Sequence, residues 1–225
     1  MAIKGILFDA ADVFYRREES TSGVARRLLQ AHGYSTGPSA DDVARLGALL
    51  SRASEGRVSP EDYWSEFLKA HGVASPEERA EMIAPILAQS HRVEALPGAR
   101  DTVSALKQRG FILGIVTDTM YPLEWKMGWL EKVGVAEFID VVACSTVLGV
   151  HKPDPAIYLH ALRQANLTVA EGAFVGHDAR EIEGARKVGL KTVAVLYDPH
   201  AQADYYAETL ADLLNVPIFQ NVQRA

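Results

Sequence analysis

Cysteine is almost missing from this sequence, in which Cys144 is the only one among 225 residues. A single cysteine cannot form an internal disulfide, and no group of cysteines and histidines has the spacing of a zinc site. This usage is typical of a protein in the reducing cytoplasm, which is the location we expect. Cys144 itself is interpreted as a small residue of the core.

Long basic runs and long apolar runs are missing as well. The formal net charge is -6, and without a basic run the counterion release that drives nucleic-acid binding has no source. No segment approaches the roughly 20 apolar residues of a membrane span, and the first apolar stretch ends at Asp9, too early for a signal peptide. We therefore expect no nucleic-acid and no membrane partner. The sequence leaves open whether the chain is a monomer or a homodimer.

The residues that are present suit a globular protein with one sizeable core and a smaller appendage, since 48% are hydrophobic and 23% charged. Five short apolar runs have the pattern of strands buried on both faces of a parallel sheet: residues 3–8, 111–116, 138–144, 173–175 and 191–196. Helical patterns at residues 99–108 and 182–188 lie between the later runs, and a glycine follows each of them closely. This alternation predicts an α/β fold with a doubly wound parallel sheet.

Residues 16–93 differ, because they contain helical patterns and no convincing strand. Ser59 and Pro60 have the pattern of a helix start, a capping serine and a first-turn proline ahead of apolar residues at helical spacing. Residues 33–38 and 72–76 have the composition of loops. We therefore predict a small all-helical domain at residues 16–93, which splits an α/β core made of residues 1–15 and 94–225.

Polar side chains follow the first two predicted strands. Asp9 ends the first apolar run, and Thr117 and Asp118 end the second, in "GIVTDT". The carboxyl ends of the strands of a doubly wound sheet face the ligand, so these side chains can contact one. The ordinary alternative is that Asp9 caps a turn and Thr117 caps a helix, and the two segments alone leave both readings open.

Two later segments also collect polar groups. Lys152 lies in "GVHKPDPAIY", where two prolines restrict the backbone and make the position of an ammonium group reproducible. His177, Asp178 and Glu181 lie in "FVGHDAREIEGARKVG", at the corner between a buried strand and a helix. Acids at such a corner can hold a metal. The alternatives are a solvated lysine, a helix cap at Asp178 and a Glu181 that faces water.

Taken together, these segments resemble the motifs of the haloacid dehalogenase-like (HAD) hydrolase superfamily over nearly the whole chain. "ILFDAADVF" is similar to the first motif, "GIVTDT" to the second, "HKPDP" to the third and "FVGHDAREIEGARKVGL" to the fourth. The helical insert resembles the cap domain that this family carries behind its first strand. The resemblance implies a Rossmann-like core, a helical cap and hydrolysis of a small anionic molecule.

The resemblance also implies roles for individual residues. Asp9 would be the nucleophile that forms an aspartyl intermediate. Thr117 would hydrogen-bond the transferred group, and Lys152 would stabilise negative charge on Asp9 and on the substrate. Ala11 and Asp118 would join Thr117 and Lys152 in contacting the substrate.

Ala11 departs from the pattern of the family's phosphatases, which have a second aspartate two residues after the nucleophile. That aspartate protonates the leaving group, and a methyl group cannot do so. Loss of a positioned general acid costs about 10²–10⁴ in rate. Asp12 comes one residue too late to replace it. A substrate with a good leaving group, such as an acyl phosphate, would not need the acid.

The metal site departs as well. The resemblance implies Mg²⁺ as cofactor, held by Asp9, the carbonyl of Ala11, Asp178 and Glu181. His177 stands where an aspartate usually helps to hold the ion, and imidazole is a poor ligand for magnesium.

The residues and the resemblance leave three functions open. A hydrolase of phosphate esters or acyl phosphates ranks first, and a HAD-like binding or regulatory protein with weakened catalysis ranks second. A 2-haloacid-type dehalogenase ranks third. It needs neither a metal nor the missing acid, and Tyr158 fits its third motif, but "TD" replaces its usual Ser-Asn pair.

Overall fold

The computed structural model describes residues 2–220, so residue 1 and residues 221–225 of the predicted core lie outside the described part. Within that part, six strands form one sheet in the order β5-β4-β1-β6-β7-β8, and all neighbouring strands are parallel. The strands are β1 (Gly5–Phe8), β4 (Ile112–Thr117), β5 (Val141–Cys144), β6 (Gly172–Gly176), β7 (Lys191–Val195) and β8 (Tyr205–Ala207). The predicted α/β fold with a parallel sheet is confirmed.

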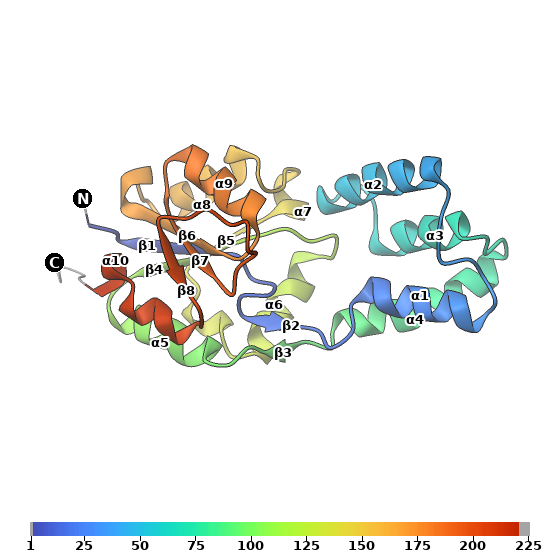
Figure 1. Ribbon diagram of the computed structural model, residues 1–225, viewed down its shortest axis with the longest axis horizontal. Helices are drawn as coiled ribbons and strands as arrows, with labels where there is room; N and C mark the ends of the chain where they lie inside the picture. The colour runs from blue at the N-terminus through green and yellow to red at the C-terminus, as the bar shows by residue number, and fades with distance from the viewer. Residues whose placement is uncertain (1, 221–225) are drawn as a thin grey trace.

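Helices cover both faces of the sheet (Figure 1). On one face, α8 (Pro155–Gln164) and α9 (Ala179–Val188) bury an apolar layer that includes Leu7 and Phe174. On the other face, α5 (Ala99–Gln108), α6 (Leu123–Lys132) and α10 (Pro217–Gln220) enclose a second layer with Phe8 and Leu113. Successive strand residues therefore point into two different cores. This explains why the strands read as continuous apolar runs.

The predicted elements of the core agree closely with the observed ones. Helix α5 has the predicted bounds, and α9 starts three residues before the predicted 182 because Asp178 caps it through two backbone N–H groups. The five predicted strands are all present. Strand β8 was missed because three residues at the edge of a sheet are too few to show a periodic pattern.

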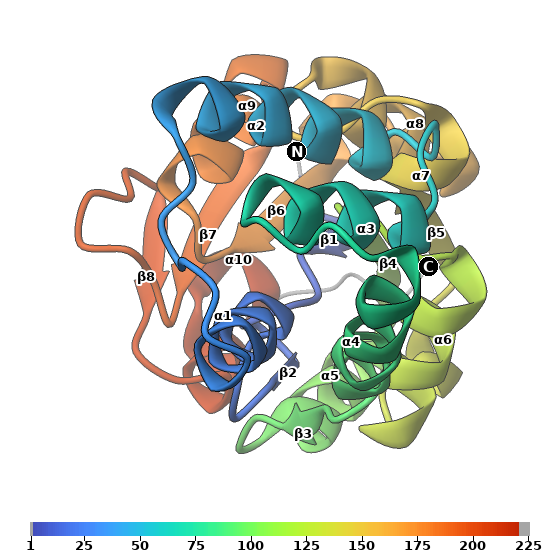
Figure 2. The ribbon, with the colours of Figure 1, turned by 90° about the vertical axis from the view of Figure 1, so that its right-hand side faces the viewer.

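The insert is built from four helices, α1 (Thr21–Ala31), α2 (Ala40–Ser54), α3 (Pro60–Ala70) and α4 (Pro76–Ser90). They pack around an apolar cluster of their own, in which Leu29, Trp64 and Ile86 are buried. Ser59 caps α3 as predicted, because its hydroxyl accepts from the backbone N–H of Asp62 at 3.0 Å. Figure 2 shows these helices in front of the carboxyl ends of the strands. No helix among residues 2–220 is both long and apolar enough to cross a membrane.

A short antiparallel ribbon joins the insert to the core. Its strands are β2 (Tyr15–Arg16) and β3 (Glu94–Ala95). The predicted domain limit at 15/16 falls inside β2, and the limit at 93/94 falls directly before β3. The expectation of no strand from residue 16 on was therefore wrong at Arg16. Two-residue strands have no readable period, and their partners lie far apart in the sequence. Arg17 strengthens the junction by donating to the carbonyl of Ser90 from Nε at 2.9 Å and from Nη2 at 2.7 Å.

Candidate active site

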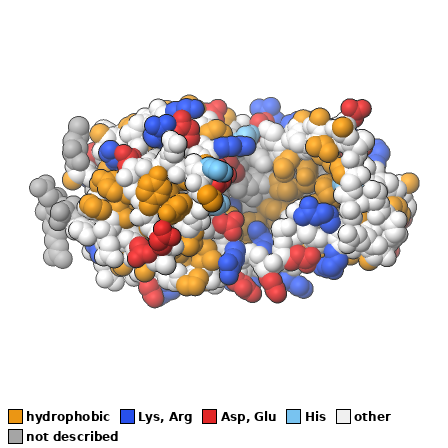
Figure 3. All heavy atoms as spheres, viewed as in Figure 1, with side chains coloured by type: hydrophobic (Ala, Val, Ile, Leu, Met, Phe, Trp, Pro, Cys, Tyr) orange, Lys and Arg blue, Asp and Glu red, His pale blue; other side chains and the backbone are white. Residues whose placement is uncertain are grey.

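The polar groups predicted from the motifs gather at one edge of the sheet. Phe8 is level with Ile115 of β4 and with Val175 of β6, so Asp9, Thr117 and the chain after Gly176 emerge side by side. The four-helix insert lies opposite this edge, and Figure 3 shows the surface hollowed between the two units, with histidine and acidic side chains at the rim. Ligands of doubly wound sheets bind at such an edge.

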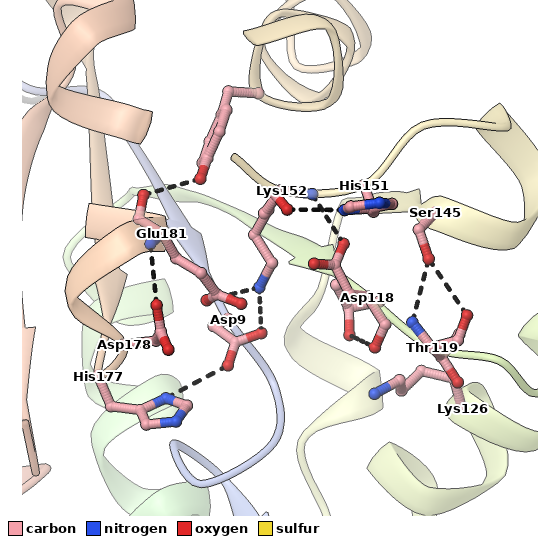
Figure 4. Close-up of polar contacts among 12 residues, drawn as sticks. Asp9, Asp118, Thr119, Lys126, Ser145, His151, Lys152, His177, Asp178 and Glu181 are labelled. Atoms are coloured by element: carbon pink, nitrogen blue, oxygen red, sulfur yellow. Dashed lines mark hydrogen bonds and ion pairs between the residues drawn. The ribbon is translucent and has the colours of Figure 1, made fainter. Parts of the chain in front are cut away.

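A buried ion pair forms the centre of the site. Lys152 Nζ donates to Asp9 Oδ1 at 2.5 Å, and the Lys152 side chain has no exposed surface. Asp9 is 5% exposed, and its backbone N–H bonds the carbonyl of Val175 at 2.9 Å, which anchors it to the end of β6. Figure 4 shows both side chains pointing toward one another. A carboxylate fixed in this way is pre-positioned for reaction.

The backbone around Lys152 is held from two sides. The Lys152 N–H donates to Asp118 Oδ1 at 3.1 Å. Asp118, the residue after β4, therefore helps to position the backbone of the lysine. On the other side, Asp154 caps α8 by accepting from the N–H of Ala156, and Pro155 is the first residue of that helix. This local structure gives the Pro-Asp-Pro segment its fixed course.

Glu181 is a second partner of the lysine. Its Oε2 accepts from Lys152 Nζ at 2.8 Å, so one ammonium bridges two carboxylates. The hydroxyl of Tyr158 donates to the backbone carbonyl of Glu181 at 2.8 Å and fixes the first turn of α9 beside the site. The resemblance implied that Glu181 is a metal ligand. No local pattern in the sequence indicates its contact with Lys152, because the two residues lie 29 positions apart on different elements.

Asp9 and Lys152 stabilise each other's charge. Burial by itself would raise the pKa of Asp9, but the positive charge of Lys152 and the contact with His177 outweigh it and lower the pKa strongly. Burial works against the charge of Lys152 too, yet the carboxylates of Asp9 and Glu181 raise its pKa. Asp9 is therefore ionised, and Lys152 protonated, at neutral pH.

Glu181 titrates differently, because burial and the nearby charge of Asp9 raise its pKa to about 7. An acid with a raised pKa in the folded chain keeps its proton longer than in the unfolded chain. Stability then falls as the pH rises from the ordinary 4.5 to about 7.

We therefore expect Glu181→Gln to remove this pH dependence. Between pH 4.5 and 7.5 the wild type should lose about 1–3 kcal/mol of unfolding free energy relative to the variant, in urea titrations at both pH values. Glu183→Gln is the matched control, since Glu183 lies on the same helix and pairs with Arg186 at the surface. A wild type and a Glu181→Gln variant with parallel pH profiles would contradict the assignment.

His177 faces the other oxygen of the nucleophile candidate. Its Nδ1 lies 3.5 Å from Asp9 Oδ2, an ion-pair distance without hydrogen-bond geometry, and 27% of its side chain is exposed. The contact with Asp9 raises the pKa of His177, against the effect of burial. Asp9 Oδ2 is thus less tightly held than Oδ1.

Thr117 and Ala11 also lie at this edge. Thr117 is fully buried at the end of β4, and its hydroxyl has only a long contact of 3.5 Å with the carbonyl of Asp118. Ala11 forms an isolated bridge with Tyr15 in the turn after β1, and Asp12 beyond it has a positive φ of 55° and an exposed side chain. Their predicted contacts with substrate stay predictions.

The predicted magnesium ligands that are side chains, Asp9, Asp178 and Glu181, do not come together as a set, and the predicted contact of the Ala11 carbonyl stays a prediction. Asp178 Oδ1 accepts from the N–H groups of Arg180 and Glu181 at 2.8 and 3.1 Å, so this carboxylate caps α9. Glu181 is bound to Lys152, and Lys152 and His177 face the two oxygens of Asp9. Among residues 2–220, no three His, Cys, Asp or Glu side chains are grouped so that they could hold a metal. The side chains present therefore do not fit the ion.

Contacts between the insert and the core were invisible in the sequence. His151 Nε2 lies 3.1 Å from the hydroxyl of Ser51 on α2, while its Nδ1 contacts the carbonyl of Lys152 at 2.8 Å. Gly56, at a positive φ of 72°, lies against the backbone of Thr146, where a Cβ would collide with the Thr146 carbonyl oxygen. The glycine lets the insert approach the core closely at Thr146.

Two further features beside the site were missed. A cavity of about 500 Å³ lies between the insert and the core, lined by residues 56–60, 120–124, 146 and 147. Lys126 of α6 is buried and donates to the hydroxyl of Tyr15 at 2.8 Å. Lysines on a helix normally indicate a solvated face, so no sequence signal marked this one.

Comparison with known proteins places the chain among hydrolases. The family model for haloacid dehalogenase-like hydrolases matches residues 6–195. Glyceraldehyde 3-phosphate phosphatase of Methanopyrus kandleri is 28% identical over 201 residues, which are 86% of this chain and 84% of that protein. Haloacid dehalogenase-like hydrolase domain-containing protein 3 of Bos taurus is 30% identical over 215 residues, 87% of this chain and 82% of the relative.

A solved structure shows the same fold. The crystal structure of a 2-haloacid dehalogenase from Pseudomonas syringae superposes with a TM-score of 0.69 at 22% identity, and the match covers 95% of this chain and 97% of that one. The family model, the relatives and the arrangement of Asp9, Lys152 and the parallel sheet agree with the motifs read from the sequence. The chain belongs to the haloacid dehalogenase-like hydrolase family.

Proposed function

We propose that the protein hydrolyses a small phosphorylated metabolite through an aspartyl-phosphate formed on Asp9. The observation that carries the proposal is the buried pair of Asp9 and Lys152 at the carboxyl edge of the sheet, 2.5 Å apart. An ionised carboxylate beside a fixed ammonium is what a two-step displacement requires. Relatives named as phosphatases of small sugar-derived phosphates support the choice of substrate class.

The first step in this proposal is attack of Asp9 on phosphorus. Oδ1 is held by Lys152, so the less tightly held Oδ2 forms the new bond while the leaving group departs with the electron pair of its bond to phosphorus. In the second step, water attacks the same phosphorus, the bond from phosphorus to Asp9 Oδ2 breaks, and its electron pair restores the Asp9 carboxylate. The proton that water loses passes to solvent. Lys152 balances the negative charge in both steps. The insert reduces access of bulk water to the intermediate.

The leaving group decides which substrates suit this site. Ala11 cannot donate a proton, and the neighbouring Asp12 side chain is exposed. Leaving groups that depart as stable anions, such as the carboxylate of an acyl phosphate, need no such donor. We therefore place acyl phosphates and activated esters ahead of alkyl phosphates as substrates.

A substrate panel tests this proposal. The purified chain is incubated with acetyl phosphate, a nitrophenyl phosphate, a set of sugar phosphates and 2-haloacids, and released phosphate or halide is measured. We expect phosphate release that is fastest for acetyl phosphate. Release of halide alone, or no release from any compound, would refute the proposal.

Replacing Ala11 by an acid should increase the rate with alkyl phosphates. Ala11→Asp should raise kcat/KM for an alkyl phosphate by about 10²-fold, since a positioned general acid is worth about 10²–10⁴. The rate with acetyl phosphate should change little, because its leaving group needs no proton. The ratio of the two rates in wild type and variant is the measurement, and Ala11→Asn is the control of equal size. An equal change for both substrates would contradict the role given to Ala11.

A 2-haloacid dehalogenase, which ranks third from the sequence, becomes the second candidate because one observation favours it. Asp9 faces nitrogen atoms of Lys152 and His177 instead of a set of oxygen ligands, and displacement of halide from carbon needs no metal and no acid. The halide arm of the panel separates the two functions. A binding or regulatory protein with weakened catalysis would be silent in both arms.

A further inference from the structure

The two oxygens of Asp9 each face a nitrogen from another element. Lys152, ahead of α8, donates to Oδ1 at 2.5 Å, and His177, ahead of α9, places Nδ1 3.5 Å from Oδ2. The lysine side chain is completely buried, and Figure 4 shows the carboxylate between the two groups. A cation bound to Asp9 Oδ2 would lie beside the His177 ring.

The neighbouring acids cannot complete an oxygen shell without giving up contacts. Glu181 holds Lys152 at 2.8 Å, and Asp118 accepts the backbone N–H of Lys152 at 3.1 Å. Asp178 accepts two N–H groups of α9. Mg²⁺ demands an octahedral set of oxygens at about 2.0–2.1 Å. Each of these carboxylates is directed instead at a nitrogen donor.

We propose that Lys152 and His177 together take the place of a divalent cation, so that the site works without a metal. This inference builds on the proposed function. Lys152 fixes Oδ1 and supplies positive charge beside the reacting phosphoryl group. The His177 ring occupies the space beside Oδ2, where its exposed edge can donate to an oxygen of the substrate. A ring nitrogen is a poor ligand for magnesium but a good hydrogen-bond partner for phosphate.

Removing the ring and supplying an oxygen ligand should therefore create a magnesium site. In titration calorimetry with MgCl₂ and no substrate, wild type should show no binding that depends on Asp9. His177→Asp should bind magnesium with an affinity at least about tenfold higher than any residual binding by the wild type. Tenfold is the lower end of the effect that a single change near a bound metal produces. His177→Asn is the matched control. It removes the ring without adding a carboxylate and should gain no comparable affinity.

Two calorimetric results would overturn the inference. Magnesium binding by the wild type that disappears in Asp9→Asn overturns the inference, whatever His177→Asp does. The same holds if His177→Asp folds, by circular dichroism, and binds no better than His177→Asn. If His177→Asp does not fold, the wild-type titration with its Asp9→Asn control decides alone.

An activity arm separates this inference from the proposed function. Phosphate release by the wild type should be unchanged within about twofold in EDTA, and a larger loss that added magnesium restores would overturn metal independence. If no phosphate is released from any substrate, the proposed function fails. The calorimetric result still decides the metal question, because it uses no substrate.

Discussion

Asp9→Asn is expected to lower kcat for every substrate of this protein by about 10³-fold or more. The amide cannot form the covalent intermediate, and the other described carboxylates at this edge of the sheet, including Asp118, are held by other partners. Glu181 is held by Lys152 and Asp178 caps α9. Steady-state release of phosphate under saturating acetyl phosphate is the measurement.

Asp12→Asn is the matched control for this loss. It makes the same chemical change three residues along the chain, at an exposed side chain whose left-handed backbone suits asparagine as well as aspartate. We expect its activity to stay within about twofold of the wild type. Residual activity of Asp9→Asn above a tenth of the wild-type rate would exclude Asp9 as the nucleophile.

The covalent step can be tested separately from the rate. In a single turnover in water enriched in ¹⁸O, attack of water on phosphorus leaves the label in phosphate and none in Asp9. Attack on the carbonyl carbon of the intermediate, as in the ester that forms when Asp9 displaces halide from a 2-haloacid, leaves the label in the Asp9 carboxylate. Mass spectrometry of the peptide that contains Asp9 therefore distinguishes the two leading functions.

The sequence predicts most of the core because its signals are local. Strands such as β4 and β7 are short, apolar and bounded by polar residues, since both faces of the sheet are covered. The ends of α5 and α9 are marked by glycines that follow them. The elements that were missed, β8 and the ribbon of β2 and β3, are two or three residues long and exist only through distant partners.

The site also has features that local sequence patterns predict and features that depend on distant partners. Which residues gather at the sheet edge follows from the motifs, because parallel strands end together. How they pair does not follow, since the bridge from Lys152 to both Asp9 and Glu181 joins three elements. The resemblance implied that Asp178 and Glu181 are metal ligands. In the structure, the Asp178 carboxylate caps α9 and the Glu181 carboxylate accepts from the buried ammonium of Lys152. Contacts of this kind depend on packing that no local pattern records.

Lys152→Met is the second variant with a large expected effect. Methionine fills a similar volume but leaves Asp9 buried without its ammonium partner. Breaking a buried pair from one side costs about 3–5 kcal/mol of unfolding free energy, and loss of one stabilising donor costs about 10²–10³ in rate. Urea unfolding and kcat are the two measurements. Lys4→Met is the control, because the Lys4 side chain is 63% exposed and its pair with Glu171 lies at the surface, where an ion pair contributes little to stability.

The contribution of the Asp9–Lys152 pair to the free energy of unfolding should also depend on pH. The pKa of Asp9 is lowered below its ordinary 3.8 in the folded chain, so the pair stabilises the fold above that pH and the stabilisation is lost progressively below it. The gap between wild type and Lys152→Met should therefore narrow as the pH falls from 5 toward 3. Adding Asp9→Asn to Lys152→Met should recover part of the lost stability at neutral pH, because no unpaired buried charge remains on Asp9. If Lys152→Met costs no more than Lys4→Met, the buried pair is not what holds Asp9 in its ionised form.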